Sequence, residues 1–192
     1  MKWRKWEIVL LTALLLSFAG QMLWEDGALE NKLTRLHVLA ASDRDQDQQL
    51  KLIVRDAVLE ASNGAERVDR VLLCRMTEAA RAALRREGEE RPVRVTLERY
   101  YFDTREYPTF TLPAGVYPAV RVVIGEGQGR NWWCVMFPPL CRGVCQEELE
   151  ELAREGGLSD EEIGLICGEE EYVIRFRLID LWHRLLHKLG QI

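Results

Sequence analysis

The spacing of the apolar residues changes once along this chain, near Pro92, and this change limits the folds that it can adopt. Between residues 42 and 87 the apolar side chains recur every three or four positions, which is the period of an amphipathic helix. After Pro92 they alternate with polar residues, which is the period of a half-buried strand. The chain is therefore expected to place helices against a sheet.

Two helices are expected before Pro92, over residues 42–62 and 65–87, since Gly64 and Gly88 follow their last apolar residues. Ser42 with Asp45 three positions later resembles a capping box, which would start the first of these helices at Ser42. A strand over residues 33–40 comes before both. In that strand Leu36 and Val38 are expected on one face, with Arg35 and His37 on the other.

The remainder of the chain is expected to add strands and then helices. Gly125, Gly127 and Gly129 predict a flexible hairpin turn, and Ser159 with Glu162 resembles a second capping box. The expected strands cover residues 93–98, 109–112, 116–124 and 131–137, and the expected helices cover 146–154, a segment from 159, and 170–189. Together they predict an α+β fold: a single compact domain over residues 33–192, with a mostly antiparallel sheet packed by helices, after a lead-in at 20–32.

The first residues have the pattern of an export signal. Lys2, Arg4 and Lys5 precede a stretch at residues 8–19 that is almost wholly apolar. Small residues stand at the −3 and −1 positions for cleavage after Ala19, so residues 1–19 are expected to be a signal peptide. An uncleaved anchor that continues to residue 23 is the alternative, because a membrane-spanning helix needs about 20 apolar residues.

The charge of the chain argues against nucleic acid as a partner. The formal net charge is −5, and removal of residues 1–19 takes away three basic residues and one acidic residue, which leaves −7. Phosphate backbones would be repelled by such a surface unless a basic patch overrides the balance. The arginines at 81, 85 and 86 do not form such a patch, because Glu87, Glu89 and Glu90 follow them.

No metal ion or other cofactor is expected from the candidate motifs. The acids Asp43, Asp45 and Asp47 resemble the start of a calcium loop, but the loop's glycine and its final glutamate are missing. His183 and His187 lie one helical turn apart without the glutamate of a metalloprotease motif.

A nucleophilic site is the remaining hypothesis that would make the chain an enzyme. His37 with a cysteine could form a nucleophilic pair, which leaves an extracytoplasmic hydrolase as the alternative function. Against it, no serine or cysteine lies in a motif such as Gly-x-Ser-x-Gly. The five cysteines stand at 74, 134, 141, 145 and 167, and their odd number leaves at least one without an intramolecular disulfide partner.

Trp132 and Trp133 are the residues most typical of a binding surface. Neighbours on a strand point to opposite faces, so one tryptophan is expected in the core and the other under a helix or in solvent. An exposed tryptophan is a typical anchor for a protein partner. A structural role for both, covered within the domain, remains open.

Two parts of the chain carry a family resemblance. Residues 36–43 and 47–58 resemble the N-terminal signature of the stage II sporulation protein R family, and so do residues 107–117, 121–127 and 131–141. The string Asn131-Trp-Trp-Cys-Val-Met-Phe-Pro-Pro-Leu-Cys141 is the most specific of these matches.

The resemblance implies a signalling protein rather than an enzyme, with no cofactor. Such proteins are exported from the forespore into the space between the two septal membranes, so membrane proximity is expected. There they trigger a membrane-embedded aspartic protease that processes the precursor of the sigma-E factor. The expected partner-binding residues are His37, Ser42, Asp43, Arg55, Asn131, Trp132 and Trp133. Cys134 and Cys141 lie in the most specific match and are the candidate disulfide of the exported protein. Two alternatives remain open: both are free, buried core residues, or Cys145 takes the place of Cys141.

Overall fold

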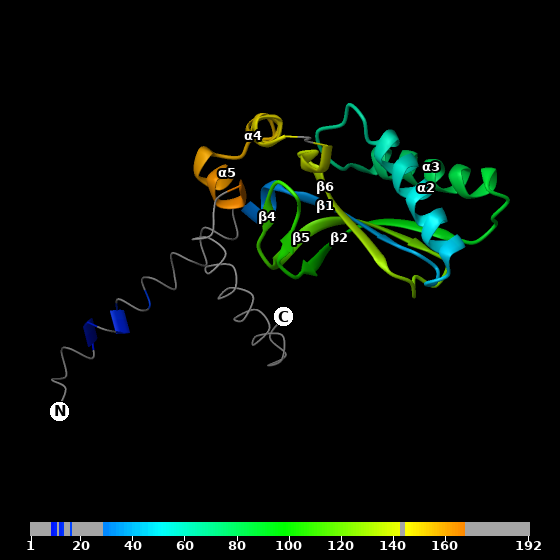
Figure 1. Ribbon diagram of the computed structural model, residues 1–192, viewed down its shortest axis with the longest axis horizontal. Coiled ribbons are helices and arrows are strands. Elements are labelled where there is room, and N and C mark those ends of the chain that lie inside the picture. Colours follow the sequence, from blue (N-terminus) through cyan, green and yellow to red (C-terminus); the bar gives the residue numbers. More distant parts are fainter. Residues whose placement is uncertain (1–8, 11, 14–15, 17–28, 143–144, 168–192) are drawn as a thin grey trace.

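The computed structural model describes residues 9–10, 12–13, 16, 29–142 and 145–167, and these residues form a mixed α+β fold (Figure 1). The predicted fold class is therefore confirmed. In chain order the elements are β1 (Thr34–Leu39), α2 (Asp45–Ala61), α3 (Arg70–Arg86), β2 (Val93–Phe102), β3 (Arg105–Glu106), β4 (Thr111–Leu112), β5 (Gly115–Ile124), β6 (Asn131–Phe137), the 3-10 turn η1 (Leu140–Arg142), α4 (Gln146–Glu155) and α5 (Asp160–Cys167).

The main sheet has four strands in the order β2-β5-β1-β6. The outer pairs, β2 with β5 and β1 with β6, are antiparallel, whereas the central pair of β1 and β5 is parallel. A small hairpin of β3 and β4 stands apart from this sheet. The sheet is thus mostly antiparallel, and β1 lies in its interior with a partner on each side.

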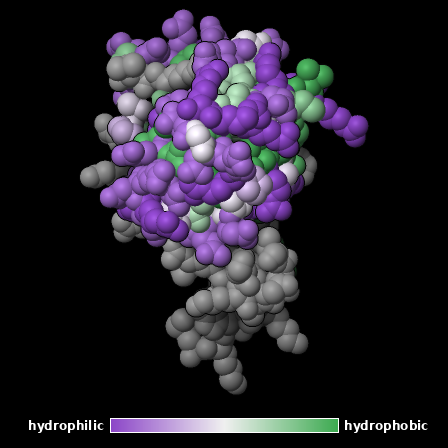
Figure 2. Space-filling view, turned by 90° about the vertical axis from the view of Figure 1, so that its right-hand side faces the viewer, coloured by the Kyte–Doolittle hydropathy of each residue, from purple (hydrophilic) through white to green (hydrophobic). Residues whose placement is uncertain are grey.

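Helices α2 and α3 pack on one face of the sheet (Figure 1). Their apolar stripes bury against the side chains of the strands that point toward them, while their outer faces are charged. Seen from the end of the molecule that carries these helices, the surface is mostly hydrophilic (Figure 2). The buried core on this face consists of Leu36, Val38, Leu50, Val54, Val58, Leu72, Met76, Ala80, Ala83, Leu84, Val93, Val120, Val122, Ile124, Cys134, Met136 and Phe137.

The opposite face of the sheet is covered only in part by the residues that the structure describes. Helices α4 and α5 and the segment before β1 bury the end of the sheet near β4 (Figure 1). This second core consists of Leu29, Leu33, Phe102, Phe110, Leu112, Tyr117, Ala119, Val135, Leu140, Leu149, Ala153, Leu158, Ile163 and Ile166. Toward the other end of the same face, Arg94, Thr96 and Asn131 are exposed.

Two predicted helix starts are wrong. Helix α2 begins at Asp45, and its N-cap residue, Arg44, makes no capping hydrogen bond through its side chain. Ser42 does not cap this helix, because its hydroxyl donates to the carboxylate of Asp47. Helix α3 begins at Arg70 rather than near residue 65, and the Asp69 side chain accepts the backbone N–H of Leu72 at 2.7 Å.

The second predicted capping box is confirmed. The Ser159 N–H donates to Glu162 Oε2 at 2.6 Å, and the Glu162 N–H donates to Ser159 Oγ at 3.2 Å. This reciprocal pair satisfies two backbone donors at the start of α5.

The glycine-rich segment at residues 125–129 is not a simple hairpin turn, because β1 lies between the two strands that it joins. The segment crosses the end of β1, where the Gly129 N–H donates to the Ala40 carbonyl at 2.9 Å. A Cβ atom at Gly129 would lie 2.3 Å from the Ser42 carbonyl oxygen. Only glycine therefore allows this close passage.

Several predictions fall outside the described residues and stay predictions. These are the helix at 170–189 with His183 and His187, and almost all of the signal peptide at residues 1–19. Among the residues that the structure does describe, no helix is long and apolar enough to cross a membrane.

Candidate functional site

The predicted partner-binding residues lie on strands β6 and β1, on helix α2 and in the turn after β1. Because side chains alternate along a strand, Trp132 and Cys134 point toward α2, whereas Trp133 and Val135 point to the opposite face. Both tryptophans are half-buried. The two faces of β6 therefore present two different chemical environments.

On the helix side, Trp132 packs against Arg55 of α2. The Arg55 guanidinium carbon lies 4.7 Å from the centre of the Trp132 ring. The guanidinium also pairs with Asp56, 2.8 Å away. A cation–π contact of this kind contributes about 0.5–1 kcal/mol at an exposed site, so it helps to hold the indole of Trp132 against α2.

On the other side, the strand register places four polar or aromatic side chains in one row across the sheet. Thr96 pairs with Arg121, Arg121 pairs with His37, and His37 pairs with Trp133. The rings of His37 and Trp133 meet edge to face with their centres 5.4 Å apart. This row marks the boundary between the covered and uncovered parts of the face.

Arginines stack on the aromatic rings around this row. The Arg105 guanidinium, from β3, lies 4.3 Å from the Trp133 ring centre. The Arg121 guanidinium lies 4.8 Å from the ring of Tyr100, and it also pairs with Glu98 at 2.7 Å. We call the surface formed by Arg94, Arg105, Arg121, Asn131 and Trp133 the arginine face.

His37 lies beneath the arginine face with no exposed surface. Burial, reinforced by the positive charge of Arg121, lowers the pKa of its imidazole to about 4, so the ring is neutral at pH 7. In the part of the chain that the structure describes, neither ring nitrogen makes a hydrogen bond of standard geometry, although the Asn131 side chain lies close enough to act on the pKa in the opposite direction. As folded, His37 supports the arginine face from below rather than forming part of its surface.

Unpartnered buried donors are concentrated around this face. Among the described residues, no hydrogen-bond partner is present for buried Trp133 Nε1 and Arg121 Nε, or for Nε and Nη1 of Arg35 on the same side of the sheet. Each such group costs about 1–3 kcal/mol when it is left unsatisfied, and native proteins contain few of them. Their grouping on one face indicates a place where a further acceptor would be stabilising.

Arg35 is the buried residue whose importance the sequence did not reveal. Its guanidinium lies 3.9 Å from the Phe102 ring centre, and Nη2 donates to the Tyr107 hydroxyl at 3.2 Å. Within the described residues it has no carboxylate partner. The available signal was the presence of Arg35 in a short strand. However, the alternation of side chains along a strand predicts that such an arginine faces solvent.

The turn after β1 has a structural arrangement. Asp43 is exposed and accepts the Arg130 N–H at 2.7 Å, which ties the turn to the start of β6. Ser42 and Arg91 both donate to the buried Asp47 carboxylate and lower its pKa. Since Asp47 is engaged by Arg91, the acids of this turn do not converge as a calcium loop requires.

No metal centre is apparent in the part of the chain that the structure describes, where no three histidine, cysteine, aspartate or glutamate side chains cluster in a way that could hold an ion. The hydrolase alternative also lacks geometric support there. His37 faces away from α2 whereas Cys134 faces toward it, and the ring neighbours of His37 are Tyr100, Phe102 and Trp133.

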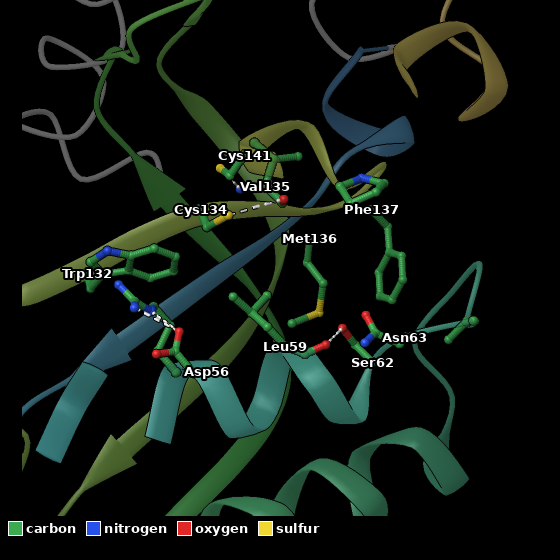
Figure 3. Close-up of a pocket in the computed structure, with 14 residues that line it drawn as sticks. Asp56, Leu59, Ser62, Asn63, Trp132, Cys134, Val135, Met136, Phe137 and Cys141 are labelled. Atoms are coloured by element: carbon green, nitrogen blue, oxygen red, sulfur yellow. Dashed lines mark hydrogen bonds and ion pairs between the residues drawn. The ribbon is translucent and has the colours of Figure 1, made fainter. Parts of the chain in front are cut away.

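A cavity of about 280 Å³ lies between α2 and β6 (Figure 3). Trp132 stands at one end and Phe137 at the other, and Arg55 and Pro139 are also among the lining residues. Cys134 and Cys141 both line it. The described cysteines form no disulfide, so the Cys134–Cys141 pairing stays a prediction, although the two thiols lie within hydrogen-bonding reach of one another.

Comparison with known proteins supports the resemblance in the sequence. A model of the stage II sporulation protein R family matches residues 30–147, which include every predicted site residue. The stage II sporulation protein R of Bacillus subtilis (strain 168) is 38% identical over 123 residues. The match covers 59% of this chain and 55% of that relative. The chain thus spans little more than half of that relative's length, and no solved structure matches. The chain belongs to the stage II sporulation protein R family.

Proposed function

We propose that this chain is an exported sporulation signal that binds and activates a membrane-embedded aspartic protease, which then processes the precursor of the sigma-E factor. Family membership supports this role. The expected signal peptide at residues 1–19 supports export into the space between the septal membranes.

The arginine face is the observation that carries the proposal. It combines arginine and tryptophan, two of the residue types that contribute most to protein–protein binding. Arg94 and Arg105 are exposed, and neither makes an ion pair within the described residues. A carboxylate or carbonyl group of a partner would find free donors there.

Activation requires a difference in affinity between two states of the protease. Binding shifts the protease toward its active state only if the chain binds that state more tightly. A rigid surface suits this task, because less conformational entropy is lost on binding. The stacking of Arg105 on Trp133, and the edge-to-face contact of Trp133 with the buried His37, provide such rigidity.

Co-expression in a host without sporulation genes tests the proposal. The full-length chain, the candidate protease and the tagged precursor are produced together, and precursor cleavage is followed by immunoblot. Cleavage is expected only when all three are present, and deletion of residues 1–19 is expected to abolish it. Equal cleavage without the chain, or with the unexported chain, would contradict the proposal.

A further inference from the structure

Cys134 and Cys141 are held together by the backbone of the residue that follows Cys134. The Cys134 thiol donates to the Val135 carbonyl at 3.3 Å, and the Val135 N–H donates to Cys141 Sγ at 3.1 Å (Figure 3). The chain leaves β6 at Phe137 and η1 then returns Cys141 to the same strand. Two sulfur atoms are thus placed side by side at the end of the cavity.

The two cysteines differ in their access to solvent. Cys134 is 2% exposed and belongs to the core beneath α2. Cys141 is an exposed residue, and the cavity reaches both side chains. Of the two residues, Cys141 is therefore the one with the greater exposed surface.

Their protonation also differs. As an alternative to the Val135 carbonyl, the Cys134 S–H can donate to the Cys141 sulfur, which lowers the pKa of the Cys141 thiol, and the Val135 N–H acts in the same direction. The same contact, together with burial, raises the pKa of Cys134. The thiolate, which is the nucleophilic form, is therefore favoured at Cys141 and disfavoured at Cys134.

We propose that Cys141 is a thiol-modification site for disulfide-bonded reagents and that Cys134 is its resolving thiol. The Cys141 thiolate attacks one sulfur of a disulfide R–S–S–R, which forms Cys141–S–S–R and releases R–S⁻. Cys134 then loses its proton to that thiolate or to water and attacks Cys141 Sγ. The second step forms the Cys134–Cys141 disulfide and releases a second R–S⁻, so the two protein thiols are oxidised and one R–S–S–R is reduced to two thiols.

Oxidation of Cys134 and Cys141 to a disulfide would restrict the movement of the cavity wall. A bond between these sulfurs links η1 to β6 and fixes one wall of the space between β6 and α2. This inference does not depend on the proposed function, because it concerns the chemistry of the chain alone.

Glutathione disulfide is a suitable probe. Full-length chain is reduced, freed of reductant and incubated with glutathione disulfide at pH 7, and peptide mass mapping follows each cysteine over time. The wild type is expected to give a Cys134–Cys141 cross-linked peptide. Cys134→Ser, whose hydroxyl keeps a donor beside Cys141, is expected to accumulate glutathione on Cys141 several-fold faster than on Cys74, because a thiol with a lowered pKa has a larger thiolate fraction.

Two controls separate geometry from simple accessibility. In Cys141→Ala, Cys134 should remain unmodified while Cys74, an exposed residue on α3, reacts as in the wild type. In denaturant, Cys141 of the Cys134→Ser variant should lose its rate advantage over Cys74. Circular dichroism verifies that each variant is folded.

Three results would overturn the inference: equal rates at Cys141 and Cys74 in the folded Cys134→Ser protein, modification of Cys134 in the folded Cys141→Ala protein, or a wild-type cross-link between Cys134 and Cys145.

Discussion

The two faces of the sheet differ in how well their side chains are satisfied. Toward α2 and α3 the strands contribute apolar side chains, and buried polar groups are confined to the edge of that core. On the other face the same strands bury Arg35 and His37 among aromatic rings and leave several nitrogen atoms without partners. Neighbouring residues of β1 thus have opposite characters, although they share one backbone.

This difference indicates which face of the sheet stabilises the fold and which face serves the proposed function. The helix-covered face resembles any well-packed core, and its residues are explained by burial alone. The groups on the opposite face cost free energy, so stability does not explain their presence. Strained or unsatisfied groups tend to occur where a protein binds or reacts, and this is why the arginine face carries the proposed function.

The largest effect on stability is expected at Leu36, which is fully buried beneath the helices. Leu36→Ala should lower the free energy of unfolding by about 2–5 kcal/mol, because it removes apolar contacts and leaves a cavity. Urea denaturation followed by circular dichroism measures this change. A loss below about 1 kcal/mol would remove the contrast between the two faces.

A somewhat smaller effect, dependent on pH, is expected from His37. The pKa of its imidazole is lowered from 6.5 to about 4 in the folded protein, so the unfolded chain binds more protons between these values. The contribution of a neutral His37 is therefore complete above pH 6.5 and is lost as pH falls toward 4, by about 3 kcal/mol at about 1.4 kcal/mol per unit.

The control for this prediction is His37→Phe, which keeps a ring among Tyr100, Phe102 and Trp133. The difference in unfolding free energy between variant and wild type should change by about 2.4 kcal/mol between pH 7 and pH 4.5, in favour of the variant at low pH, and the rest of the change follows below pH 4.5. A difference independent of pH would show that His37 titrates normally.

The smallest effect is expected at Arg35, the neighbour of Leu36. Replacing a buried charge that has no acidic partner by an apolar side chain of similar length is often neutral or stabilising. Arg35→Met should therefore change the free energy of unfolding by less than about 1 kcal/mol, measured by the same urea titration. A loss as large as that of Leu36→Ala would mean that Arg35 is needed for the fold.

The elements of the fold could largely be predicted from periodicity, whereas the order of strands could not. The alternation of Val93, Val95 and Leu97 predicted β2, and the strand in fact continues to Phe102. The start of α3 was predicted too early because Ala65 and Val68 pack on the same core without being helical. Strand order depends on contacts between distant segments, which local spacing does not encode.

The candidate site was predicted in part. Adjacent tryptophans were correctly expected on opposite faces of a strand, and the structure brings Arg55 to one and His37 to the other. Arg105 and Arg121 were missed, because an arginine on a strand normally points to solvent. Their role becomes visible only when the register and the β3–β4 hairpin place them over aromatic rings.

The central claim is that the arginine face engages the protease, and one comparison of charge reversals tests it most directly. Arg105→Glu changes this face, and Arg75→Glu makes the same change at an exposed position on α3. In the co-expression assay, with the level of each exported variant verified by immunoblot, Arg105→Glu is expected to reduce precursor cleavage at least ~10-fold, the loss of a typical binding hot spot. Arg75→Glu is expected to leave it unchanged. Equal cleavage with both variants, or a loss confined to Arg75→Glu, would contradict the claim.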